Sequence, residues 1–316
     1  MRQIDFEHGG IAQNILKAAL PMLVAQVLNL LYNIVDRIYI ARIPDIGTAA
    51  LGAVGLCFPI IVIITAFSNL FGSGGAPLFA IARGSGDKAR AGLILNLACT
   101  LLLCCAGVLM VIGLLFARPI LVLFGASPEA LQYALPYLML YLLGTYPSML
   151  TTGLNPFINA QGYATAGMLS VVIGAAANLV LDPVFIFVLG MGIRGAAAAT
   201  VLAQAVSAVM CLLYAFREYP ELHLSGQDFH AEVCVYAQHL GQGLPMGLQF
   251  SVLAIGIIVM QRALVGFDIG PDGIMAAGNP AQNGFGAANK LNNFLMCPMN
   301  ALIQVSEEHD VIESHL

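Results

Sequence analysis

The chain has 316 residues, of which 59% are hydrophobic and only 9% are Asp, Glu, Lys or Arg, whereas about 25% of an average soluble domain is charged. Its 12 basic and 17 acidic residues cannot cover a soluble body of this size, and a net charge of −5 excludes an electrostatic nucleic-acid binder. The composition therefore indicates a polytopic membrane protein whose surroundings are the lipid bilayer.

Stretches without Asp, Glu, Lys or Arg recur along the chain. A helix needs about 20 apolar residues to cross the hydrocarbon core. The longest stretch, residues 130–181, holds 52 and must contain two passes, separated at residues 159–162. Runs such as the three leucines at 101–103 lack the alternation of a membrane β-barrel. The predicted fold class is an all-α polytopic membrane protein, with helices at residues 15–40, 49–71, 91–116, 130–154, 166–189, 196–216 and 240–264 and an eighth, broken span between residues 273 and 304.

The loops and a weak repeat suggest the topology. With a cytoplasmic N-terminus, six basic residues of the short loops lie inside and four outside, which favours that orientation. Leu-Pro-Met at residues 20–22 recurs at 244–246, and Ile-Val at 34–35 recurs at 258–259, both at an offset of 224. A repeat unit with an even number of helices returns the chain to the side where it began. The repeat therefore predicts two six-helix lobes in the same orientation.

The repeat divides the chain into expected domains. Residues 1–217 form the first six-helix lobe, 218–238 a cytoplasmic linker, 239–304 the start of a second lobe, and 305–316 a divergent acidic tail. At the offset of 224 the last residue corresponds to position 92, so most of the second lobe is expected to be missing. The tail is either a departure from the ancestral sequence near residue 304 or a solvated acidic end, and composition does not choose between them.

Two acidic residues fall well inside the predicted spans. A charged side chain in hydrocarbon costs about 2.5 to 3.5 kcal/mol even on the insertion scale. Asp36 lies about twenty residues into the first helix and Asp182 about sixteen into the fifth. With a rise of about 1.5 Å per residue their carboxyl groups reach similar depths, so we expect them to share one site. A local pair of Asp36 with Arg37 is the alternative.

Polar residues follow the helix faces that carry these acids. Because lipid does not tolerate such seams, they are expected to face a shared interior cavity; hydrogen bonding between helices, worth about 0.6 kcal/mol per contact, is the alternative and is preferred for Ser170 and Ser207. The seams are Gln26, Asn29, Asn33 and Asp36 in the first helix, Thr151, Asn155 and Asn159 in the fourth, Ser170, Gly174, Asn178 and Asp182 in the fifth, and Thr200, Gln204 and Ser207 in the sixth.

The acids suggest ion coupling without any other cofactor. An Asp held away from water can exchange a proton near neutral pH or bind Na⁺ together with amide and carbonyl oxygens, so no metal site is expected beyond Na⁺ at Asp36 and Asp182. Pro21 and Pro183 each remove a backbone hydrogen bond and are either hinges or fixed kinks. No nucleophile with a base and no metal cluster is found, so the chain is not expected to be an enzyme.

Two other features are assigned to loops. The glycine-rich residues 72–75 and 84–86 lack the Gly-Lys-Ser/Thr of a nucleotide site and are expected to form tight turns at the end of the second helix. The histidines between the sixth and seventh helices have no metal-ligand spacing and are expected to be solvated; they are His223, His230 and His239.

Several motifs together make the sequence resemble the multidrug and toxic compound extrusion (MATE) family. They are Pro21, Asn33 and Asp36 in the first helix, Asn-Ala-Gln-Gly at 159–162, Asn-Leu-Val-Leu-Asp-Pro at 178–183, Met-Gly-Ile-Arg-Gly followed by four alanines and Thr at 191–200, Gly-Leu-Pro-Met-Gly-Leu-Gln at 243–249, and Pro-Met-Asn-Ala-Leu at 298–302. The likeness covers roughly residues 11–304. Family members continue with four more spans, and residues 278–284 look inserted.

The resemblance implies a monomeric exporter in the cell membrane that moves small cationic or amphipathic drugs by antiport of H⁺ or Na⁺ through two six-helix lobes. By that analogy the coupling residues are Asp36, Asn178, Asp182 and Thr200, with Asn33 beside them. The expected substrate cavity comprises Gln26, Asn29, Asn155, Gln204 and Gln249. A lipid-linked oligosaccharide flippase of the same superfamily and an inactive remnant are the alternatives.

Overall fold

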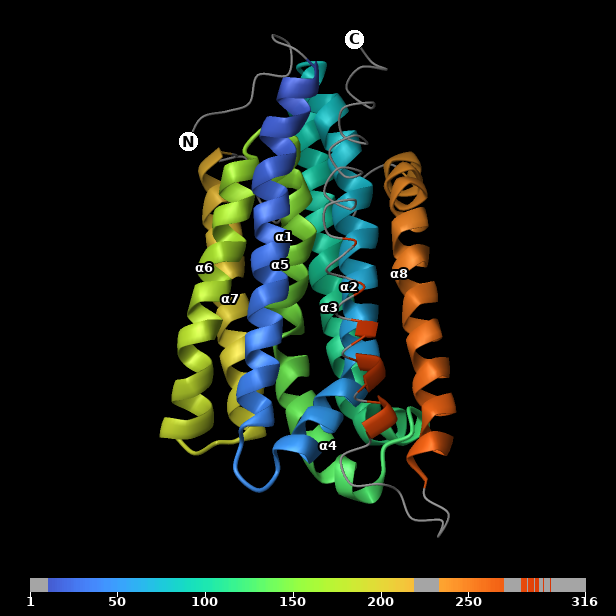
Figure 1. The fold of residues 1–316 in the computed structure, drawn as a ribbon. Helices are drawn as coiled ribbons and strands as arrows, with labels where there is room; N and C mark the ends of the chain where they lie inside the picture. The colour runs from blue at the N-terminus through green and yellow to red at the C-terminus, as the bar shows by residue number, and fades with distance from the viewer. Residues whose placement is uncertain are drawn as a thin grey trace.

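A computed structural model describes residues 11–218, residues 233–269 and part of the range 280–296. The described chain is a bundle of long, roughly aligned helices (Figure 1). The helices are α1 (Ile11–Ala41), α2 (Gly47–Gly84), α3 (Lys88–Leu123), α4 (Pro128–Leu143), α5 (Thr145–Ala160), α6 (Ala164–Pro183), α7 (Ile193–Glu218) and α8 (Val233–Asp268), with a short π-helix, η1 (Val184–Val188), directly after α6. The helical fold class predicted from the sequence is confirmed.

Local sequence explains where several helices begin and end. The side chain of Asp87 accepts the N–H of Arg90 at 3.0 Å and caps α3, and Ser127 caps α4 by accepting the N–H of Ala130 at 3.1 Å. Such caps satisfy N–H groups that have no partner within the helix. Gly162 has φ of 82° between α5 and α6, a conformation that glycine adopts without a Cβ clash. The expected break at residues 159–162 is therefore confirmed.

Within the part of the chain that the structure describes, six helices are long and apolar enough to cross a membrane. The candidate spans are Leu20–Ala41, Gly47–Gly84, Lys88–Leu123, Ala164–Val188, Ile193–Ala215 and Val235–Asp268. The predicted fourth span differs, because it consists of two helices, α4 and α5, that meet at Gly144. A side chain at this position would clash with Val201 of α7, so the bend occurs where α7 approaches most closely.

The expected linker, residues 218–238, overlaps the start of a helix. Helix α8 begins at Val233, whereas residues 219–232 lie outside the described residues. The same holds for the acidic tail at 305–316, for His223 and His230, and for most of the expected eighth span, in which helical residues are described at 280–282, 284–286 and 288–289.

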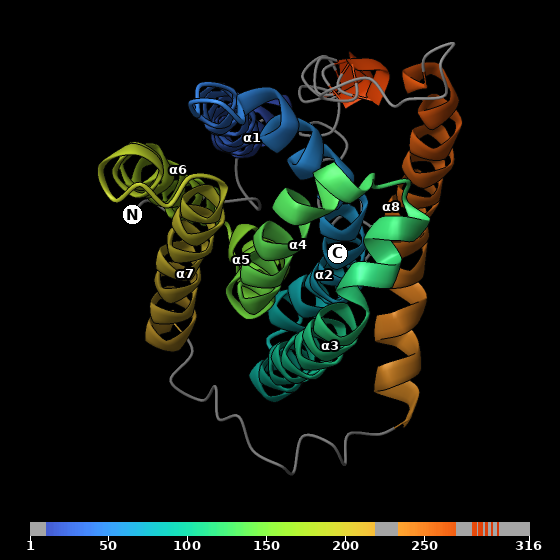
Figure 2. The same cartoon turned by 90° about the horizontal axis from the view of Figure 1, so that it is seen from below.

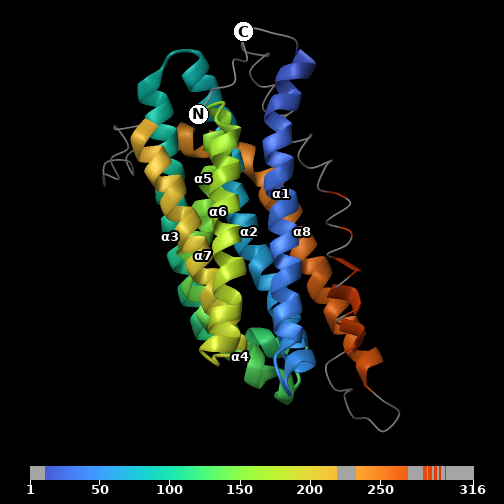
Figure 3. The same ribbon diagram turned by 60° about the vertical axis from the view of Figure 1, so that its left-hand side comes forward.

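Helix α2 lies in the middle of the bundle. It packs against α3, α4, α5 and α8, while α6 packs against α1 and α7. Seen along the bundle, α6 and α7 lie on one side and α8 on the other (Figure 2), and α1 runs beside α6 (Figure 3). Large side chains from several helices are fully buried around α2, among them Leu56, Phe79, Leu102, Leu138 and Phe157. The opposite helix faces expose leucines, valines and phenylalanines, as expected for surfaces that contact lipid.

Two loop predictions were wrong at the contact between α2 and α8. Residues 72–75 are helical and lie inside α2, where Gly74 faces Gly243 of α8 at backbone distance. His239 is fully buried, and its Nε2 lies 2.8 Å from the carbonyl oxygen of Phe71. In hydrocarbon a polar backbone must form its own hydrogen bonds, so the glycines stay helical and instead permit close packing. We call Gly74, Gly75, His239 and Gly243 the α2–α8 seam.

Candidate functional site

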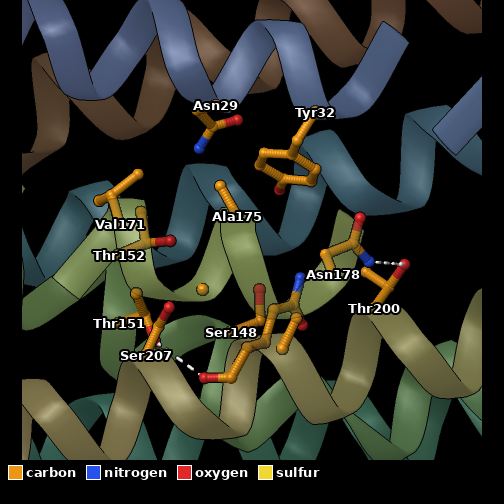
Figure 4. Close-up of a pocket in the computed structure, with 13 residues that line it drawn as sticks. Asn29, Tyr32, Ser148, Thr151, Thr152, Val171, Ala175, Asn178, Thr200 and Ser207 are labelled. Atoms are coloured by element: carbon orange, nitrogen blue, oxygen red, sulfur yellow. Dashed lines mark hydrogen bonds between the residues drawn. The ribbon is translucent and has the colours of Figure 1, made fainter. Parts of the chain in front are cut away.

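A polar cavity lies between α1, α5, α6 and α7 (Figure 4). Its empty space, part of which is open to the surroundings, is about 490 Å³. Its polar lining residues are Asn29, Tyr32, Ser148, Thr151, Thr152, Asn178, Thr200, Gln204 and Ser207. A second cavity of about 750 Å³ shares Asn29, Thr151 and Thr152 with it and adds Gln26, Asn69, Asn155 and Asn159. The two spaces form one polar region inside the bundle.

Asp182 and Asn178 lie one helical turn apart at one end of this region, and each is only 1% exposed. The Asn178 side-chain amide donates to Asp182 Oδ1 at 3.3 Å and to Thr200 Oγ1 at 3.5 Å; Figure 4 shows the second of these contacts. Thr200 in turn donates to the carbonyl oxygen of Ala196 at 2.9 Å. The amide therefore links α6 to α7 and fixes the position of the Asp182 carboxyl group.

Asp36, which belongs to α1, lies beside the Asp182 carboxyl group. The carboxyl groups of Asp36 and Asp182 lie close enough to interact electrostatically. Two ionised carboxylates placed in this way repel strongly, so a shared proton or a cation is needed to hold them together. The structure thus brings the two acids of the first and fifth spans into one site. Arg37 interacts electrostatically with Tyr137 and with Asp36, so the alternative of a local pair stays open.

The oxygen atoms around the acids suit a proton or a hard cation. Asn178 Oδ1 and Asp182 Oδ2 are buried and have no hydrogen-bond donor among the described residues. Together with Asp36 and Thr200 they supply carboxylate, amide and hydroxyl oxygens, the ligand types that hard cations prefer. A buried oxygen without a donor is costly, and either a proton or Na⁺ would satisfy it.

The other predicted residues of the first six helices lie along the two cavities or next to them. Asn33 donates to the carbonyl oxygen and the side chain of Asn29 at 2.8 and 3.0 Å. Asn155 donates to the carbonyl oxygen of Gly167 at 3.1 Å, and Gln204 contacts the Tyr141 hydroxyl at 3.4 Å. Gln26 lines the second cavity.

Gln249 is not brought to this region. Its side chain is exposed on α8, which packs against α2 on the far side of the bundle from α6 and α7 (Figure 2). Its expected place in the substrate cavity stays a prediction.

The hinge candidates have different surroundings. Pro21 lies inside the continuous helix α1. Pro183 is the last residue of α6, and the π-helix η1 begins at the next residue. In η1 the N–H of Leu189 bonds to the carbonyl oxygen of Val184 at 2.9 Å, a wider turn that often occurs near functional sites.

Ser170 and Ser207, for which hydrogen bonding between helices was the preferred role, join α6 to α7, since the Ser207 hydroxyl donates to the Ser170 carbonyl oxygen at 2.9 Å. The sequence interpretation missed other lining residues, namely Asn69, Tyr32, Ser148 and Thr152. In the sequence Tyr32 precedes Asn33 and Thr152 follows Thr151, two residues of the predicted polar helix faces. Their helix positions fall at the edge of the polar stripe, so a strict periodicity leaves them out.

Taken together, the long apolar helices and the polar, acid-containing cavity inside them define a polytopic helical membrane protein with the architecture of a transporter. The MatE family model matches residues 21–184, more than half of the chain. This chain belongs to the MatE family, whose members are transporters.

Relatives and solved structures agree with this assignment. A multidrug export protein MepA of Staphylococcus haemolyticus is 26% identical over 255 residues, which cover 80% of this chain and 56% of the relative. For MepA of Staphylococcus aureus (strain MRSA252) the identity is 23% over 209 residues, or 66% and 46% of the two chains. The chain therefore spans about half the length of the curated relatives it matches.

Solved structures share the fold. An outward-facing multidrug resistance MATE family transporter of the MOP superfamily has a TM-score of 0.83 at 23% identity, covering 100% of this chain and 70% of that one. A MATE crystal structure in the straight conformation gives a TM-score of 0.82 at 23% identity, with coverage of 100% and 70%. At this level of identity the likeness establishes the helical arrangement alone.

Proposed function

We propose that this chain exports small cationic or amphipathic drugs across the cell membrane by antiport of H⁺ or Na⁺. The observation that carries the proposal is the proximity of the Asp36 and Asp182 carboxyl groups beside a polar cavity. The relatives named as multidrug export proteins support it.

The coupling step uses the two acids. Binding of a proton or Na⁺ between Asp36 and Asp182 removes their mutual repulsion and draws α1 toward α6, whereas release of the ion separates them. Asn178 and Thr200 hold Asp182 in place during this exchange. Since η1 follows Pro183 directly, the end of α6 can bend when the charge of the site changes.

The cavity suits drugs of mixed polarity. Its walls combine amide and hydroxyl groups with the aromatic ring of Tyr32, and an aromatic face attracts cations. A drug cation in the cavity and a coupling cation at the acids repel each other across the same interior. Occupancy of one site therefore opposes occupancy of the other, which is the requirement for antiport.

The remaining features of the proposal concern the whole protein. The N-terminus lies on the cytoplasmic side, residues 1–217 form the first lobe and residues 239–304 begin the second, and the transporter acts as a monomer. The orientation and the lobes follow from the loop charges and the internal repeat, and the monomeric state is what the resemblance to the MATE family implies.

The proposal is tested by ethidium transport in vesicles that contain the full chain. An imposed pH gradient and an imposed Na⁺ gradient are compared, and the gradient that drives transport identifies the ion. Asp36→Asn and Asp182→Asn are expected to abolish driven transport. The matched control is Asp45→Asn, which changes an exposed loop acid and is expected to retain it. Undiminished transport in the Asp36→Asn/Asp182→Asn double variant, or none in the unmodified chain, would refute the proposal.

A further inference from the structure

Some polar side chains of the two cavities are not used by the protein itself. Within the part of the chain that the structure describes, the side chains of Gln26 and Thr152 form no hydrogen bond, although both line the second cavity. Each is only partly buried, and none of its polar atoms is sealed off. Their amide and hydroxyl groups therefore face the cavity and are available to a ligand or to water.

Asn29 lies one turn from Gln26 on the same face of α1. The side-chain oxygen of Asn29 accepts a hydrogen bond from Asn33 at 3.0 Å, and its N–H groups have no partner among the described residues. Asn29 and Thr152 line both cavities, and Figure 4 shows them on opposite walls of one space, formed by α1 and α5. We call Gln26, Asn29 and Thr152 the amide–hydroxyl subsite.

The neighbouring polar residues are already bonded within the protein. Asn69 donates to a carbonyl oxygen of its own helix at 2.9 Å, Asn155 to one of α6 at 3.1 Å and Thr151 to one of α7 at 3.3 Å. These bonds hold the walls in place before any ligand binds, which reduces the entropy cost of binding. The amide–hydroxyl subsite is thus the part of this lining that is left to discriminate between ligands.

Charge does not select ligands at this place. No described residue that lines either cavity is charged, and Gln26 lies ten residues, or about 15 Å, from Asp36 along α1. The apolar part of the wall includes Met22 and Met168, whose flexible thioethers adapt to rings of different shape. Two lipophilic cations of equal charge are therefore distinguished here by their hydrogen-bonding groups.

We propose that the amide–hydroxyl subsite recognises an uncharged amino or hydroxyl group on an amphipathic drug, which makes compounds with such a group the preferred substrates. This inference rests on the proposed export function. Gln26 Oε1 and Thr152 Oγ1 accept the N–H or O–H groups of the substituent, and the Asn29 amide donates to the oxygen of a hydroxyl group. A site built in this way rejects an analogue without the substituent, because its polar groups lose their bonds to water and find no replacement.

The test compares two monovalent lipophilic cations, ethidium and tetraphenylphosphonium. Ethidium carries two aromatic amino groups, whereas tetraphenylphosphonium has neither a donor nor an acceptor. Binding to the purified full chain in detergent is measured by fluorescence anisotropy for ethidium and by equilibrium dialysis for labelled tetraphenylphosphonium. The variants Gln26→Met and Thr152→Val keep the approximate size of each side chain and remove its hydrogen-bonding group.

Each variant is expected to lower ethidium affinity about fivefold or more, the effect of one lost hydrogen bond. Tetraphenylphosphonium affinity is expected to stay unchanged or to rise, because this ligand no longer covers an unpaired polar group. A purely structural role would lower both affinities together. That result, unchanged ethidium affinity, or no ethidium binding to the unmodified chain overturns the proposal.

Two exposed residues provide matched controls. Gln242→Met on α8 and Thr165→Val on α6 are expected to bind both cations as the unmodified chain does. Each variant is first checked for an unchanged elution profile and helix content, and Gln26→Met tests the subsite by itself if Thr152→Val does not fold. Thr152→Ser keeps the hydroxyl group and is expected to retain ethidium affinity. An equal loss in folded Thr152→Ser and Thr152→Val would overturn the role of the hydroxyl group.

The outcome is separable from that of the export function, because binding is measured without a gradient. Driven ethidium transport together with equal binding by all variants would overturn the subsite alone. Loss of ethidium affinity in the two subsite variants without driven transport by the unmodified chain would overturn the export function and leave the subsite intact.

Discussion

An alanine at Gly243 is expected to separate α2 and α8. The added methyl group would overlap the carbonyl oxygen of Leu70 and lie 2.8 Å from its carbonyl carbon and 3.2 Å from the Cα of Gly74. Carbon atoms pack at about 3.5 to 4.0 Å, so α8 must move away by roughly 1 Å along the α2–α8 seam. Overpacking of this kind costs about 1 to 3 kcal/mol, here in a contact between backbones that cannot rotate aside.

Gly256→Ala is the matched control, because a Cβ atom at this position of α8 would meet nothing within 4 Å. Alanine there gains up to about 1 kcal/mol of helix propensity. The two variants are compared by thermal unfolding in detergent, where about 1 kcal/mol corresponds to a shift of roughly 2 to 4 °C for a large domain. Gly243→Ala is expected to lower Tm by several degrees, and Gly256→Ala to leave it unchanged or raise it. A Gly243→Ala protein as stable as the control would refute the close-packed seam.

Three further variants test other contacts by the same thermal unfolding measurement. His239→Leu removes the bond to the Phe71 carbonyl oxygen and is expected to cost about 1 kcal/mol; a rise in Tm would contradict this. Asp87→Ala removes the cap of α3 and is expected to cost about 1 kcal/mol, whereas Asp87→Asn keeps an acceptor and should stay close to the unmodified chain. Ser207→Ala removes a bond between α6 and α7 and is expected to cost only about 0.6 kcal/mol, so a loss of several kcal/mol would show a larger role.

The helices and the acid pair could be predicted because both depend on strong physical penalties. Charges are so unfavourable in lipid that charge-free windows locate most spans, and the break at residues 159–162 follows from the length of one window. The same penalty singles out Asp36 and Asp182, and the helix rise per residue then gives their depth. The resemblance to the MATE family adds Asn178 and Thr200, which the structure places beside Asp182.

The errors have a different cause. Glycine-rich stretches indicate turns in water, where the backbone can bond to solvent. Residues 72–75 lie in an apolar bundle, where unsatisfied backbone groups are costly, and they therefore remain helical. The burial of His239 depends on its partner helix, because the space above Gly75 admits the imidazole ring. Periodicity along one helix contains no information about which glycine lies opposite.

Close packing also determines the geometry of the acid site. A Cβ atom at Gly174 of α6 would overlap the hydroxyl group of Ser207 on α7, so the two helices approach closely at this level. That approach, one turn from Asn178, allows its amide to reach Thr200 at 3.5 Å while it holds Asp182. A larger residue at 174 would push α7 away and break this link before it touched the acids. Small residues therefore contribute to the site as directly as the polar ones, although they carry no chemical group.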